Sequence, residues 1–251
     1  MTKQKPPTAH HSVPVWLSKR FCGVDGLLWW RRHDWPTTET KRSSPGALFY
    51  KNNLNTRYAA DGSKDVEVES KLAEIDGIIA SITACLVNQC RQGNSPDLDE
   101  ESLAFLYSYA FVQFKRPPEL REDGVGTHNE WVDAVLEPSQ EVSRVLKTKG
   151  LCLWSTPPGS ALILGSQVVL RAGSGRPGRL DHSDHGITFP LASDVLLGFV
   201  PGSSRREHDM LSVREIVSVN RATGACCMTI AGPDRLTVLS AGTRYSRSSV
   251  Q

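Results

Sequence analysis

The sequence lacks any apolar run long enough to cross a membrane. A transmembrane helix needs about 20 consecutive apolar residues, and no stretch of this 251-residue chain approaches that length. Residues 1–8 contain Lys3 and Lys5, but no apolar segment of the kind found in secretory signal peptides follows them. We therefore expect a cytoplasmic protein without a membrane partner, and we expect residues 1–8 to form a flexible leader.

The sequence also lacks an excess of charge of one sign. Its 29 basic and 27 acidic residues give a formal net charge of +2. A protein that coats nucleic acid over a broad surface carries a large basic excess. The balance therefore argues against such a surface, and it leaves nucleic acid or a nucleotide as a partner only through a local site.

Cysteine patterns typical of metal sites are absent. The chain has six cysteines but no CxxC pair, and its His and Cys residues do not have the spacing of a structural zinc site. Free thiols that behave as small apolar groups are the expected state. The Walker A, GxSxG and HExxH motifs are absent as well. No cofactor is identified by these patterns, and a divalent metal remains a candidate.

What is present is the composition of a globular core. Hydrophobic residues make up 39% of the chain and charged residues 22%, both ordinary values for a folded domain. The length is sufficient to bury a sizeable core, and no internal repeat is visible. Extended, helical and again extended patterns follow one another along the chain. We expect one α+β domain over residues 9–251, with a helical part at about 65–149 and a sheet-rich part at about 150–240.

The N-terminal part has extended character. An apolar and basic run from Val15 to Phe21 and a second run from Leu27 to Arg31 flank the turn-forming tetrapeptide GVDG. This pattern predicts an N-terminal β-hairpin. After a polar loop, residues 47–50 (ALFY) are expected to form a short strand or a buried anchor.

The middle of the chain has helical periodicity. Apolar residues recur at steps of three and four over about residues 65–90, which predicts a long helix. A second helix is expected at 99–116, because acidic residues in its first turn suit the helix dipole and a proline pair stops it. Residues 119–130 are expected to form a loop, and residues 131–149 to be helical in part.

After Gly150, short apolar runs alternate with clusters of Gly, Pro, Ser and Asp, which predicts an antiparallel or mixed sheet. Residues 172–186 form a loose loop. Its two histidines, His182 and His185, lack the helical frame that sets two imidazoles on one metal ion. A last helix is predicted over residues 210–220, with Ser212 as a candidate cap.

Two adjacent histidines open the stretch AHHSVPVWLSKRF at residues 9–21. His10 and His11 either end the flexible leader or are held against the core by the segment that follows them. In the second case their imidazoles could bind a metal or carry a proton near neutral pH. The residues alone favour the first interpretation.

Two further polar groups are candidates for a site. Glu69 and Asp76 are seven residues apart and share one side of the predicted helix. A charged side is ordinarily a solvated face, yet Glu69 borders the apolar stripe. The segment QFKRPP, residues 113–118, closes the next helix, where Arg116 suits the helix dipole and could equally clamp a carboxylate or a phosphate. The sequence does not separate these roles.

These blocks resemble, in their order, the bacterial and fungal family catalogued as domain of unknown function 4238. The likeness covers roughly residues 9–240. The opening is similar to the family's His-His-x-Val-Pro motif, and QFKRPP to its Gln-x-x-Arg-x-Pro motif. Four shorter blocks resemble its Phe-Tyr element, its helix bearing two acids, its Pro-Leu-Ser segment and its late asparagine, and they are Leu48-Phe49-Tyr50, Val68-Glu69 with Asp76, Ile187 to Leu191, and Val219-Asn220.

One block of the family is changed here. The Ser-Asp-x-Pro motif keeps Ser166 but has Gln167 in place of the aspartate and Val169 in place of the proline. The Pro-Leu-Ser segment likewise ends in Ala192. If the aspartate were a metal ligand or a catalytic acid, this member would be weak or inactive. The resemblance brings no established activity, but it implies a structured role for the two N-terminal histidines.

We expect a polar cluster between the helices and the sheet, and two functions follow from it. One is a metal-assisted hydrolase or nuclease acting on phosphodiesters. The other is a non-catalytic interaction module of a toxin–antitoxin or defence-type system, in which the polar network fixes the fold. The candidate catalytic residues are His10, His11, Glu69, Asp76 and Arg116, and the candidate ligand-binding residues are Gln113, Ser166 and Asn220.

Overall fold

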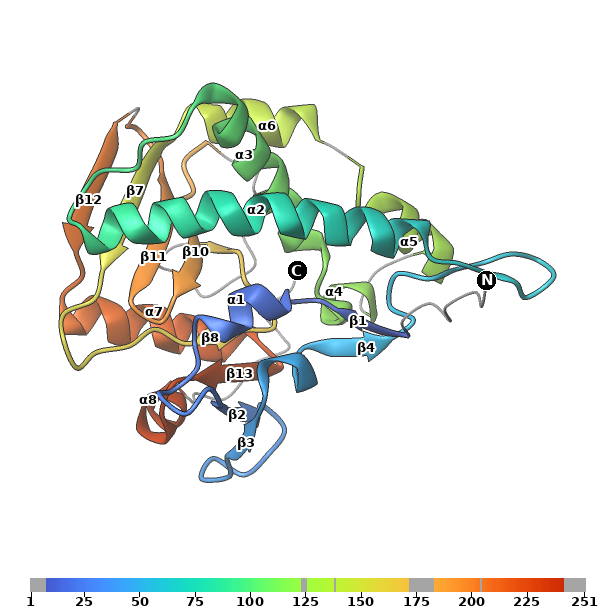
Figure 1. Cartoon of the computed structure of the whole chain (residues 1–251), viewed down its shortest axis with the longest axis horizontal. Coiled ribbons are helices and arrows are strands. Elements are labelled where there is room, and N and C mark those ends of the chain that lie inside the picture. The colour runs from blue at the N-terminus through green and yellow to red at the C-terminus, as the bar shows by residue number, and fades with distance from the viewer. Residues whose placement is uncertain (1–7, 123–125, 138, 172–182, 204, 242–251) are drawn as a thin grey trace.

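A long helix and two β-sheets set the architecture of the computed structural model, which describes residues 8–122, 126–137, 139–171, 183–203 and 205–241. Helix α2 (Glu67–Arg91) crosses the middle of the molecule (Figure 1). One sheet packs directly against it, and the second sheet lies below it in this view. The α+β class predicted from the sequence is confirmed.

The sheet against α2 has five strands in the order β12-β7-β11-β10-β9. All neighbouring pairs are antiparallel except β12 and β7, which are parallel, so the sheet is mixed. Strands β7 and β11 are buried over most of their length, which explains their continuous apolar sequence. The strands are β7 (Gly150–Ser155), β9 (Leu170–Arg171), β10 (Ile187–Ala192), β11 (Val195–Val200) and β12 (Arg206–Met210).

The second sheet brings the two ends of the chain together. Its order is β3-β2-β13-β8, and every pair is antiparallel. Helix α8 packs on β13 and β2, and α7 packs near β8. Ser212 caps α7, as predicted, and does so through a capping box. The helix predicted over residues 210–220 begins instead at Val213, after β12, and continues to Cys226. The elements are β2 (Leu28–Arg32), β3 (Lys41–Ser43), β8 (Leu164–Gly165), β13 (Thr229–Gly232), α7 (Val213–Cys226) and α8 (Arg235–Ser240).

The helical layer follows the predicted periodicity. Helix α3 (Glu100–Lys115) packs on α2, and α6 (Gln140–Lys147) packs on α3. The loop predicted at 119–130 is wrong, because α4 (Pro118–Glu122) and the start of α5 (His128–Ala134) occupy it. A proline is accommodated in the first turn of a helix, so the proline pair that ends α3 also allows α4 to begin.

The predicted hairpin is also wrong in its first strand. Residues Val15–Lys19 form helix α1, and β2 pairs instead with β3 across the loop that follows it. The apolar residues that fix α1 are spaced by four, since Val13, Leu17 and Phe21 are all fully buried. The predicted turn does form, with the N–H of Gly26 donating to the carbonyl of Gly23.

Two short strand pairs complete the N-terminal region. β1 (Ala9–His11) pairs with β4 (Tyr50–Asn52), and β5 (Arg57–Tyr58) pairs with β6 (Lys64–Asp65). The 3₁₀ turn η1 (Pro45–Ala47) precedes β4. Leu48 and Phe49 are buried, so the segment predicted as a strand or an anchor is an anchor that leads into a strand. Residues 172–182, including His182, lie outside the described residues.

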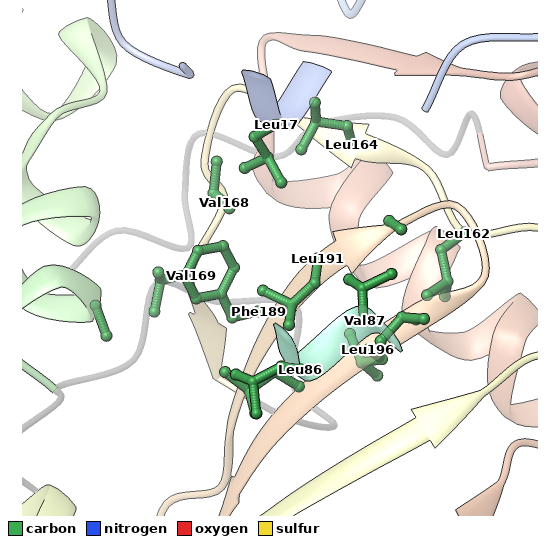
Figure 2. Packing of buried hydrophobic residues seen from close by; sticks show 14 of the residues in the cluster. Leu17, Leu86, Val87, Leu162, Leu164, Val168, Val169, Phe189, Leu191 and Leu196 are labelled. Atoms are coloured by element: carbon green, nitrogen blue, oxygen red, sulfur yellow. The ribbon is translucent and has the colours of Figure 1, made fainter. Parts of the chain in front are cut away.

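One large cluster of buried apolar side chains joins these layers. It draws on α1 through α3 and on both sheets, so the N-terminal and C-terminal parts share a core. Figure 2 shows members from α1, α2, β8 and β10 facing one another, among them Leu17, Leu86, Leu164, Phe189 and Leu191.

The six cysteines are free thiols, as predicted. Burial raises the pKa of Cys90 and of Cys226 to about 11, so both thiols are protonated at neutral pH. Cys85 is exposed.

Among the described residues, no helix has the length and apolar character needed to span a bilayer.

Replacing Leu17 tests the helical assignment of residues 15–19. Leu17→Ala should lower the free energy of unfolding by about 2–5 kcal/mol, because the side chain is fully buried and its removal leaves a cavity. Val24→Ala, at an exposed turn position, is the control and should change it by less than about 0.5 kcal/mol. Equal losses in urea titrations of the two variants would contradict the packing of α1.

Lys115 at the end of α3 should make stability depend on pH. Its ammonium donates to the carbonyls of Ala134 and Glu137 and lies 4.2 Å from the centre of the Phe111 ring. Burial lowers its pKa from 10.5 to about 8, and the Glu137 carboxylate opposes that shift only in part. Between these two values the unfolded chain binds a proton that the folded chain does not. This lysine therefore makes stability rise with pH through that interval.

The measurement is urea unfolding at pH 7.5, 9 and 10.5. Lys115→Met should have a flatter pH profile than the unmodified chain, because the titrating amine is gone. Lys147→Met, which removes an exposed lysine of α6, should keep the original profile. Identical profiles for all three proteins would show that Lys115 has the same pKa in the folded and unfolded states.

Candidate functional site

Strand β1 places the two N-terminal histidines on opposite sides. His10 is fully buried, and its Nδ1 accepts a hydrogen bond of 2.9 Å from the backbone N–H of Asn55. Glu69 Oε2 lies 3.5 Å from the same nitrogen and accepts from the Asn55 side-chain amide at 2.7 Å. An Nδ1 that accepts from a backbone N–H does not donate to a carboxylate at the same time, so Asn55 links the two side chains.

His11 takes no part in that cluster. Its Nε2 lies 3.1 Å from the carbonyl oxygen of Gly46, and its ring lies against Tyr50 with centroids 5.9 Å apart. Of the two histidines, only His10 lies within reach of an acid of α2. Successive residues of a strand point to opposite faces, and the two imidazoles accordingly have different neighbours.

A second cluster surrounds Arg116. The guanidinium is almost fully buried and donates to both oxygens of Asp76 at 2.8 and 2.9 Å. Gln113 Oε1 accepts from Arg116 at 3.2 Å, and the Tyr109 hydroxyl lies 3.2 Å from both Asp76 and Gln113. Burial lowers the pKa of Arg116, but the charge and hydrogen bonds of Asp76 together with the charges of Tyr109 and Glu69 outweigh it, so the net shift is upward.

This cluster is tied to the N-terminal segment through Gln113. Its side-chain amide donates to the backbone carbonyl of Ser12 at 2.8 Å. Ser12 in turn donates through its backbone N–H and its hydroxyl to the carbonyl of Phe49, at 2.8 and 3.0 Å. Phe49 has a φ of 56°, a left-handed conformation that a bulky residue keeps only when its surroundings hold it there.

The remaining predicted ligand-binding residues lie elsewhere. Asn220, on α7, accepts from the N–H of Ile163 at 3.0 Å and donates to the carbonyl of Ala161 at 2.9 Å. Both contacts fix the chain that enters β8, which is a structural role. Ser166 is buried, and its hydroxyl lies 3.5 Å from the backbone nitrogen of Thr229.

The side chain of Gln167 acts as a hydrogen-bond donor. Its side-chain amide lies 3.2 Å from the carbonyl of Val169 and 3.4 Å from that of Phe114. An ionised aspartate could only accept hydrogen bonds, so it could not make these contacts. In this chain the residue that replaces the family's aspartate holds the backbone between β8 and β9.

The described residues contain no group of three or more His, Cys, Asp and Glu side chains arranged to hold a metal. Glu69 and Asp76 are each engaged by a neutral amide or a guanidinium. The candidate divalent metal therefore gains no ligand set from the part of the chain that the structure describes.

A pocket of about 460 Å³, which we call the Trp30 pocket, lies next to Ser12 and Ser166. Strands β2, β4 and β13 and helix α4 contribute to it. Of the predicted site residues only Ser166 lines it. The indole Nε1 of Trp30 and Oε2 of Glu119 are buried without a hydrogen-bond partner. The pocket is also lined by Arg32, Phe49, Tyr50, Lys51 and Thr229.

Most of the residues that line this pocket were not among the site residues predicted from the sequence. The run Leu28–Arg32 (LWWRR) sets aromatic and cationic residues side by side, a composition suited to binding aromatic anions. That signal was available, but the run was assigned only to a hairpin. No comparable signal marks Glu119, because the segment that carries it was predicted to be a loop.

Comparison with known proteins gives one match. The family model described as a protein of unknown function (DUF4238) matches residues 9–230, which agrees with the resemblance found in the sequence. No curated protein and no solved structure matches the chain.

Removing the carboxylate of Asp76 tests the architecture of the Arg116 cluster. Asp76→Asn should lower the free energy of unfolding by about 3–5 kcal/mol, because it leaves a buried guanidinium without its counter-charge. Glu67→Gln breaks an exposed ion pair on the same helix and should cost less than about 1 kcal/mol. The double variant Asp76→Asn/Arg116→Met should recover stability relative to Asp76→Asn. If the two single variants unfold at the same urea concentration, the ion pair does not support the fold.

Proposed function

Because the chain belongs to the DUF4238 family, a family of unknown function, we propose a role from its own geometry. The protein is a binding module for a ligand that carries an aromatic ring and a phosphate, such as a nucleotide. The ligand occupies the Trp30 pocket, and the cluster around Arg116 holds the walls of that pocket in place.

The composition of the Trp30 pocket carries the proposal. Its volume lies within the range of about 300–1,000 Å³ typical of small-molecule sites. The rings of Trp30 and Tyr50 offer faces on which a base can stack. Arg32 and Lys51 supply positive charge for a phosphate. The guanidinium of Arg32 is oriented by Asp34, which accepts from it at 2.9 and 3.0 Å.

Polar groups suited to reading a base line the same pocket. Glu119 offers a carboxylate that accepts hydrogen bonds, and Ser166 offers a hydroxyl that donates and accepts them. A pocket with aromatic walls, a cationic edge and few polar groups matches the chemistry of a nucleotide better than that of a sugar or a lipid.

The hydrolase or nuclease that acts on phosphodiesters is the weaker proposal. It would require His10, Glu69, Asp76 and Arg116 to reach a substrate, yet all four bind one another or neighbouring groups and none lines the Trp30 pocket. A catalytic group must lie within hydrogen-bond reach of the reacting atoms. A paired network of this kind supports architecture, and it agrees with the non-catalytic alternative of an interaction module, for which a toxin–antitoxin or defence-type system is one setting.

Isothermal titration with AMP, GMP, CMP and UMP tests the proposal. At least one nucleotide should bind saturably with 1:1 stoichiometry. Tyr50→Ala should weaken that binding about tenfold, because a stacking ring is lost. Leu236→Ala, which shortens an exposed side chain outside the pocket, should leave it unchanged. With Mg²⁺ present, the dinucleotide pApA should not be cleaved at its phosphodiester bond.

Two outcomes would overturn the proposal. One is the absence of saturable binding for all four nucleotides at millimolar concentration. The other is equal binding by the Tyr50→Ala and Leu236→Ala variants, which would place the ligand away from the Trp30 pocket. Cleavage of the dinucleotide pApA to AMP that depends on Mg²⁺ would favour the phosphodiester hydrolase instead.

A further inference from the structure

A second pocket adjoins the first. It has a volume of about 360 Å³, and we call it the Trp131 pocket. Lys51 and Pro118 line both pockets, so the two meet at β4 and the start of α4. Of the residues that line this second pocket, only Pro118 belongs to a motif singled out in the sequence, QFKRPP.

Aromatic side chains again form part of the wall. Tyr58 and His128 pack with ring centroids 5.6 Å apart, and Trp131 lines the pocket from α5 with its indole Nε1 buried and without a hydrogen-bond partner. The side chain of Asn129 pairs with both backbone groups of Tyr58, at 3.0 and 2.8 Å. His128 Nε2 lies 2.8 Å from the carbonyl oxygen of Thr56. These contacts fix β5 against α5, so the aromatic wall is preformed.

No negatively charged residue is among the described residues that line the Trp131 pocket. Its described lining includes Lys51, His128 and the amides of Asn52 and Asn53. Lys51 thus lies where two pockets with aromatic walls meet. That order, an aromatic wall, a cation and a second aromatic wall, matches two bases joined through a phosphate.

We propose that the two pockets form one groove for a single-stranded nucleic acid segment, with one base in each pocket and the linking phosphate at Lys51. The inference rests on the proposed function and identifies its substrate class. Bases that enter separate pockets must be unstacked from each other, which favours a single strand over a duplex. The net charge of +2 agrees, because a duplex-binding surface would need more cations.

The experiment compares AMP, ADP and the dinucleotide pApA, in ribose and deoxyribose forms, by titration of the full chain. The dinucleotide should bind at least about tenfold more tightly than AMP, the gain expected from stacking one further base. ADP adds a phosphate without a second base, and it should bind within about threefold of AMP. A preference for one sugar would identify RNA or DNA as the natural strand.

Two variants, each with a matched control, locate the second base and the phosphate. Tyr58→Ala should remove the advantage of pApA and leave AMP binding unchanged, whereas Tyr58→Phe, which keeps the ring, should retain the advantage. Lys51→Gln should weaken pApA, and Lys147→Gln, an exposed lysine of α6, should not. Thermal unfolding of each variant confirms that it is folded before its binding is compared.

The outcomes separate this inference from the proposed function. If AMP binds in the Trp30 pocket but pApA binds no more tightly, the groove is refuted and the nucleotide site stands. If ADP gains as much as pApA, the second pocket takes a phosphate and not a base, which also refutes the inference. If none of the three ligands binds, the inference fails, and the proposed function fails with it when GMP, CMP and UMP do not bind either.

Discussion

The buried ion pair between Arg116 and Asp76 is the interaction on which the N-terminal half depends. A guanidinium that is almost fully removed from water is tolerated only with a counter-charge and further hydrogen-bond acceptors. Asp76 supplies the charge, and Gln113 supplies another acceptor. Since Asp76 lies on α2 and Arg116 ends α3, the pair fixes the relative position of the two longest helices described.

The same ion pair also supports the backbone that lines the Trp30 pocket. Gln113 is oriented by Arg116 and holds the backbone of Ser12, and Ser12 holds the carbonyl of Phe49 at the start of β4. β4 is paired along its length with β1. Two of its residues, Tyr50 and Lys51, line the Trp30 pocket. A polar cluster that could be mistaken for a catalytic centre therefore acts as a support for the surface beside it.

The changed family block fits this division of roles. Ser166 lines the Trp30 pocket, whereas Gln167 bonds backbone carbonyls and Val169 is fully buried. The residue that matches the motif borders the pocket, while the residues at the two altered positions serve packing. In the binding module proposed here, replacement of an aspartate that does not face the ligand leaves the pocket intact.

The sequence by itself determined those features that depend on neighbours within a few residues. The apolar period of α2 and the Ser212 cap of α7 are local patterns, and both were predicted. The run Val15 to Phe21 was misassigned because a seven-residue run with four apolar side chains suits a helix and a strand equally. There the burial of Leu17 decides, and burial is a property of the packed chain.

Only the tertiary structure decided the candidate site. Sequence reasoning named His10, Glu69, Asp76, Gln113 and Arg116, and these do lie near one another, but it could not tell a self-paired cluster from an open one. A pocket exists where packed elements leave space, and no period along the chain records that space. Trp30 and Glu119 are 89 positions apart (119 − 30), and the fold alone makes them neighbours.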